Sequence, residues 1–102
     1  MWERLESIEA RYEELTSRLA DPEVAADYTR VQELARERAA LEPVVRLLRD
    51  HRQVVRSLED ARQLLAETSD PELRELAQEE VRTLTEQEER LVQELKLALL
   101  PK

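Results

Sequence analysis

Four arginines in the middle of the chain are the side chains whose type and spacing best suit a binding function. They are Arg46, Arg49, Arg52 and Arg56. On a helix these positions share an arc of about 120°, opposite the apolar face of the same stretch. Guanidinium groups bind phosphates and carboxylates through paired N–H donors. This arginine ridge allows two interpretations: ion pairs with acids along a bundle, or a narrow basic surface for RNA or an acidic protein partner.

The residue types that carry catalysis and metal binding are scarce. His51 is the only histidine and the chain has no cysteine, so a His-based metal site or a Ser/His/Asp triad lacks its components. His51 borders the apolar face and is expected to pack at its edge. Paired glutamates could bind a hard cation only with converging loops, so we expect a solvated face at Glu13–Glu14, Glu79–Glu80 and Glu88–Glu89. We predict no catalytic residue, no cofactor and no metal.

The composition limits the function further. The 102 residues include no glycine, and a chain without this residue cannot form phosphate-cradling or dinucleotide-binding loops. A charged fraction of 39% is typical of long helices in one small domain. The net charge of −8 argues against a broad nucleic-acid-binding surface. No apolar run could span a membrane, and the absence of cysteine fits a cytoplasmic location.

The apolar periodicity predicts three helices, at residues 2–19, 28–67 and 71–99. Asp21-Pro22-Glu23 ends the first and opens a short turn, and Asp27 is the expected cap of the second. Asp70-Pro71-Glu72 opens the third. The expected core positions are Leu5, Ile8, Tyr12, Leu15, Leu19, Val31, Leu34, Leu41, Val45, Leu48, Val55, Leu58, Ala61, Leu65, Leu73, Ala77, Val81, Leu84, Leu91 and Leu95.

The long helix at residues 28–67 organises the predicted fold. Its apolar stripe turns by well over a right angle between the two halves, which indicates that each half faces a different partner helix. Pro43 lies near the changeover, and its neighbours are not turn formers, so we expect a bend and not a loop. The predicted fold is all-α: an elongated antiparallel three-helix bundle or helical hairpin with one long, Pro-kinked central helix. It should be three helices thick in the middle and two at the far tip.

The last residues depart from a one-sided pattern. Apolar side chains at 95, 97, 98, 99 and 100 surround the helix just before Pro101. A free terminus is not expected to expose leucine on every side. We therefore expect a helical domain at residues 1–99 and, at residues 100–102, the start of a linker to a following domain.

Several segments resemble the N-terminal domain of bacterial class I peptide chain release factors. They are Arg4-Leu5-Glu6 through Tyr12-Glu13-Glu14-Leu15, Leu19-Ala20-Asp21-Pro22-Glu23-Val24, Ala40-Leu41-Glu42-Pro43-Val44-Val45, Asp70-Pro71-Glu72-Leu73-Arg74-Glu75-Leu76-Ala77 and Glu94-Leu95-Lys96-Leu97-Ala98-Leu99-Leu100-Pro101-Lys102. The resemblance covers the chain in register, with a weaker match between Val24 and Val31. The two Asp-Pro-Glu segments, the Leu-Glu-Pro segment and the Leu-Leu-Pro-Lys ending are its most specific parts.

The resemblance implies a factor that reads the stop codons UAA and UAG on the ribosome and triggers hydrolysis of peptidyl-tRNA through a Gly-Gly-Gln loop. It implies that this domain projects toward the base of the large-subunit stalk. It also implies a link to the GTPase that removes release factors. The glycine-free chain cannot hold the Gly-Gly-Gln loop, so no enzymatic activity is expected of this part alone.

Two other functions remain open on the residues alone. An all-helical chorismate mutase also uses three helices with arginine-rich faces, but it requires an intertwined dimer with a buried dicarboxylate pocket. A coiled-coil scaffold or helical arm should show one continuous apolar seam, whereas this chain shows two. We expect a monomer that docks on the ribosome.

Overall fold

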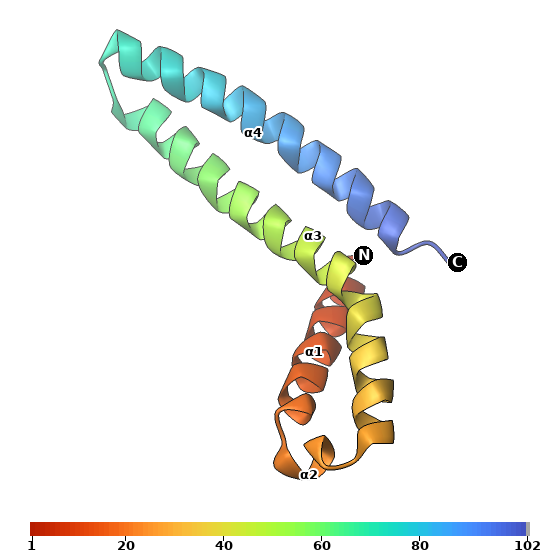
Figure 1. Cartoon of the computed structure of the whole chain (residues 1–102). Helices are drawn as coiled ribbons and strands as arrows, with labels where there is room; N and C mark the ends of the chain where they lie inside the picture. Colours follow the sequence, from red (N-terminus) through yellow and green to blue (C-terminus); the bar gives the residue numbers. More distant parts are fainter. Residues whose placement is uncertain (102) are drawn as a thin grey trace. The chain divides into compact units, whose positions relative to one another are not determined.

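The computed structural model describes residues 1–101 and contains four α-helices. They are α1 (Trp2–Leu19), α2 (Pro22–Ala25), α3 (Tyr28–Glu67) and α4 (Pro71–Ala98), coloured along the chain in Figure 1. The all-α class and the bounds of the three long helices agree with the sequence-based prediction, apart from one residue at the end of α4. The chain divides into two compact units, Met1–Leu48 and Arg49–Lys102, and α3 contributes to both.

Aspartates begin three of the helices. The Asp21 carboxylate accepts a hydrogen bond from the backbone N–H of Glu23 at 2.9 Å, and the Asp70 carboxylate accepts one from Glu72 at 3.0 Å. A proline follows each of these two caps at the first helical position, where its missing N–H costs nothing. The Asp27 carboxylate accepts the N–H of Arg30 at 3.3 Å. The predicted caps are therefore confirmed.

In the first unit, α1 and α2 pack against the N-terminal half of α3. Leu15, Val24 and Leu34 form a buried cluster, one from each helix. Partly buried side chains of Leu19, Val31 and Leu41 surround it. Val24 is 4% exposed, so the short α2 contributes a core residue that helical periodicity over four residues could not reveal.

In the second unit, the C-terminal half of α3 and α4 form an antiparallel hairpin. Arg74 near the start of α4 bonds the carbonyl of Leu65 near the end of α3, while His51 lies 3.9 Å from Glu88 farther along both helices. The buried side chains in this unit are Leu58, Ala61, Ala77, Leu91 and Leu95. Leu73 was predicted to be a core residue and this is wrong, because it lies in the first turn of α4 and is 42% exposed.

The long helix α3 continues through Pro43 without a loop. Both Pro43 and Ala39, whose carbonyl loses its usual N–H partner, are solvent-exposed, so water can satisfy the freed oxygen. The buried face also turns along the helix, because Leu34 and Val45 lie on a different side from Leu58 and Ala61. The first half packs against α1 and the second against α4, as predicted. A bend at Pro43 and a three-helix section remain predictions.

Among the described residues, no helix combines the length and the apolar character needed to cross a bilayer.

Candidate functional site

The arginine ridge lies on α3, with Arg46 in the first unit and the other three residues in the second. Arg46, Arg49 and Arg56 are exposed, and Arg52 is half-buried. All four are helical, as expected. Within the second unit, Arg49, Arg52 and Arg56 share one arc of α3 because of the helical periodicity.

Two of these arginines have partners within their own helix. The Arg46 guanidinium donates to Glu42, one turn earlier, at 3.1 Å, although 73% of the Arg46 side chain stays exposed. The Arg56 guanidinium donates to the amide oxygen of Gln53 at 2.9 Å. Exposed pairs of this kind contribute about 0–1 kcal/mol. A phosphate or carboxylate could therefore replace either partner at little cost.

His51 lies at the edge of the α3–α4 packing. Its side chain is only 13% exposed, and Nε2 is 3.9 Å from a carboxylate oxygen of Glu88. This position agrees with the prediction of a packed or edge histidine.

The glutamate pairs lie on exposed helix faces, as predicted, except that Glu88 lies at the edge of the α3–α4 packing. Glu13, Glu14, Glu79, Glu80 and Glu89 are exposed, and Glu88 is half-buried. Glu79 and Glu86 pair with Arg82 within α4, and its hydrogen bond to Glu79 raises the pKa of Arg82. Within residues 1–101, no group of three or more acidic or histidine side chains is placed to bind a metal ion.

An ion-pair cluster that the sequence analysis missed joins α1 to α3. The Arg11 guanidinium donates to both carboxylate oxygens of Glu37, at 2.5 and 2.8 Å, and lies 3.3 Å from Glu14. The hydrogen bond from Arg11 lowers the pKa of Glu37, and the same bond raises the pKa of Arg11. These partners are 26 residues apart, so no pattern of local spacing could have identified them.

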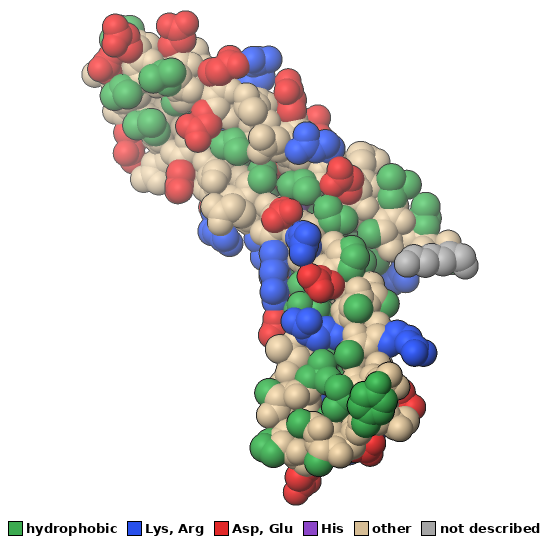
Figure 2. All heavy atoms as spheres, in the orientation of Figure 1, with side chains coloured by type: hydrophobic (Ala, Val, Ile, Leu, Met, Phe, Trp, Pro, Cys, Tyr) green, Lys and Arg blue, Asp and Glu red, His purple; other side chains and the backbone are tan. Residues whose placement is uncertain are grey.

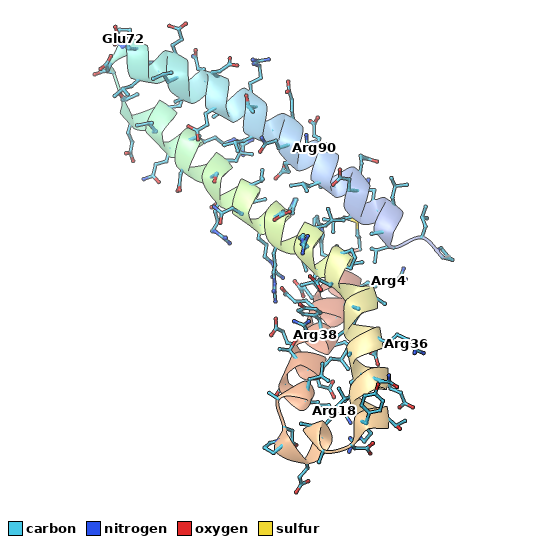
Figure 3. The ribbon with its side chains drawn as sticks, viewed as in Figure 1. Arg4, Arg18, Arg36, Arg38, Glu72 and Arg90 are labelled. Carbon is cyan, nitrogen blue, oxygen red and sulfur yellow. The ribbon has the colours of Figure 1, made fainter. Side chains whose placement is uncertain are left out.

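A second α1–α3 contact uses Arg38, which Figure 3 shows on the side of α3 that faces α1. Its Nε donates to the Thr16 hydroxyl at 2.8 Å, and its guanidinium carbon lies 4.5 Å from the centre of the Tyr12 ring. Cation–π geometry of this kind adds about 0.5–1 kcal/mol at an exposed site. Arg36, two residues earlier, points away from α1 (Figure 3). The arginines of α3 thus divide between structural contacts and exposed positions.

Among the described residues, the exposed side chains are better suited to binding a partner than to catalysing a reaction. Exposed guanidinium groups on a helix can bind phosphates or carboxylates. His51, the only histidine, is largely covered by packing. Within residues 1–101, the exposed side chains thus resemble those of a binding surface more than those of an active site.

The chain belongs to the PCRF domain family, whose sequence profile matches residues 8–102. Curated relatives named "Peptide chain release factor 1" are 43% identical over the whole chain in Geobacillus kaustophilus (strain HTA426) and 46% identical over 97% of the chain in Anaeromyxobacter sp. (strain Fw109-5). A third, from Clostridium botulinum (strain Hall), is 45% identical over the whole chain. No solved structure gives a significant match.

The chain spans only 26–28% of the length of these relatives. It is therefore related to one part of a translation termination factor. This assignment favours the release-factor interpretation over the chorismate mutase-like and coiled-coil alternatives.

Proposed function

We propose that this chain is the N-terminal domain of a translation termination factor and that it docks the factor on the ribosome. The observation that carries the proposal is the PCRF match over residues 8–102, together with relatives at 42–46% identity named for peptide chain release. In this proposal, residues 1–99 form the domain and residues 100–102 begin a linker.

The complete factor would read UAA and UAG and trigger hydrolysis of peptidyl-tRNA in the cytoplasm. Both tasks belong to segments other than this chain, which has no glycine for a Gly-Gly-Gln loop. The helical domain would contribute binding without any chemical step. Its expected place is the base of the large-subunit stalk, with a functional link to the GTPase that removes release factors.

The arginine ridge is the proposed contact with ribosomal RNA. Arg46 and Arg56 pair with solvent-accessible side chains of their own helix, and arginine suits bidentate binding of phosphate. A narrow ridge also fits a chain whose net charge is −8, because a few phosphates can be bound locally while the rest of the surface is repelled.

The test is a charge reversal of the three exposed ridge arginines in the full-length factor. Arg46→Glu, Arg49→Glu and Arg56→Glu together should weaken ribosome binding at least about tenfold at low salt. The slope of log affinity against log salt should also fall by roughly 2–3, as expected for three lost phosphate contacts. Filter binding or fluorescence anisotropy over a salt series measures both quantities.

A matched control reverses three exposed arginines outside the ridge: Arg62, Arg82 and Arg90. Figure 3 labels Arg90 on α4. This variant changes the net charge equally and should leave the salt slope unchanged. If both variants weaken binding equally, general electrostatics explain the effect. If neither does, the ridge is a solvated helix face.

A further inference from the structure

The end of the α3–α4 hairpin exposes a group of leucines within the second unit. Leu64 and Leu73 are each 42% exposed and Leu76 is 67% exposed. Leu64 lies in the last turn of α3, and the other two lie in the first two turns of α4. In Figure 2 hydrophobic side chains gather over this end of the hairpin. We call Leu64, Leu73 and Leu76 the leucine patch.

Acidic side chains surround this patch. Residues 64–80 contain a single basic residue, Arg74, and six acidic ones: Glu67, Asp70, Glu72, Glu75, Glu79 and Glu80. Figure 2 shows acidic side chains around the hydrophobic ones, and Figure 3 labels Glu72 at the start of α4. A hollow beside the patch is lined by Glu72, Glu75, Leu76 and Glu79.

The one basic side chain in this stretch offsets only one of the six negative charges. Arg74 is half-buried, and its Nη1 donates to the carbonyl oxygens of Leu65 at 2.7 Å and Thr68 at 3.2 Å. The guanidinium is thus engaged with the end of α3 and the connecting loop. The leucine patch keeps an acidic rim.

Apolar patches rimmed by charged residues mark protein interaction sites, and the charge of the rim selects the partner. The acidic rim repels the phosphates of RNA, and it would also repel the same rim of a second copy. We propose that the leucine patch binds a protein partner through a basic segment that presents an apolar stripe, such as an amphipathic helix rich in lysine. This inference is independent of the ridge and of the proposed ribosome docking.

The test uses two labelled synthetic peptides of identical lysine and leucine composition. One places its leucines at helical i, i+3 and i+4 spacing, and the other distributes them around the helix. The chain should bind the striped peptide at least tenfold more tightly by fluorescence anisotropy. Leu73→Ser/Leu76→Ser should reduce this preference below about threefold, with helicity checked by circular dichroism. Leu76→Ser alone, at the more exposed position, should also lower the preference.

Leu97 provides a matched control because it lies on the same helix and is also 67% exposed. Leu97→Ser should retain the full preference for the striped peptide. Glu72→Gln/Glu75→Gln should weaken both peptides alike and reduce the salt dependence of binding.

Any of the following results would overturn the proposal. One is equal affinity for the two peptides, or a preference that survives Leu73→Ser/Leu76→Ser. Another is a dimer in sedimentation equilibrium that Leu76→Ser dissociates, which would assign the patch to a second copy. The last is binding of an oligouridine 20-mer that requires the leucines, which would assign it to RNA. None of these measurements involves the ribosome, so they are separate from the test of the ridge.

Discussion

Arg74 replaces the glycine that commonly ends a helix. Helices often end on a glycine in the left-handed conformation, which lets backbone N–H groups satisfy the last carbonyls. This chain has no glycine, and none of its described residues adopts a positive φ. At the end of α3, Arg74 Nη1 instead donates to the carbonyls of Leu65, at 2.7 Å, and Thr68, at 3.2 Å. Its positive charge also complements the negative end of the helix dipole.

We therefore predict that Arg74→Met destabilises the chain by about 2 kcal/mol. A hydrogen bond to a charged group contributes about 1.5–3 kcal/mol, but the second bond is long and the guanidinium is only half-buried. Methionine keeps much of the apolar stem while removing every donor. Arg74→Lys, which keeps the charge but not the planar fork, should lose about half as much.

Urea denaturation followed by circular dichroism measures this change. With a slope of about 1.5 kcal/mol per M, the midpoint should fall by about 1.3 M while the slope itself stays unchanged. Arg82→Met is the control, because Arg82 pairs with Glu79 and Glu86 on its own exposed face of α4 and its loss should cost less than about 0.5 kcal/mol. A loss below that value for Arg74→Met, or equal losses for both variants, would refute this role of Arg74.

Two further predictions concern the first unit. Leu15 is fully buried within the cluster that joins α1, α2 and α3, so Leu15→Ala should cost about 2–5 kcal/mol, measured by the same denaturation. The pKa of Glu37 is lowered from the ordinary value of 4.5 by Arg11, so the pair stabilises the fold above that pH and loses this effect as the pH falls toward the lowered value. Thermal melts over a pH series should give wild type a higher melting temperature than Glu37→Gln at neutral pH, and this difference should disappear in acid. A difference in melting temperature that stays constant with pH would contradict the pairing.

The helix bounds could be predicted because their signals are local. Asp21, Asp27 and Asp70 each accept a backbone N–H two or three residues ahead, and prolines follow two of them. The turning of the apolar face of α3 could also be read from side-chain periodicity. The caps depend on residues within one turn of each other, and the apolar face depends only on positions along a single helix, so both can be identified without knowing how the helices pack.

The contacts that fix helices against each other could not be predicted in the same way. Arg11 finds Glu37 26 residues away, and Arg74 bonds carbonyl groups across a turn. Many arginines and glutamates have suitable chemistry, and only the packing selects which of them meet. The prediction that Leu73 is buried was wrong for a related reason. Its spacing fits the apolar stripe of α4, but it lies beside the turn that ends the hairpin and remains exposed.

The two proposed surfaces differ in the physical force that would dominate binding. The arginine ridge would act through phosphate neutralisation, which weakens steeply with salt. The leucine patch would act through burial of apolar area, which salt screens little, with its acidic rim adding a weaker salt-dependent part. Contacts of the complete factor can therefore be separated by combining a salt series with variants: binding that is lost between low and physiological salt and requires the ridge arginines belongs to the ridge, and binding that persists and requires Leu76 belongs to the patch.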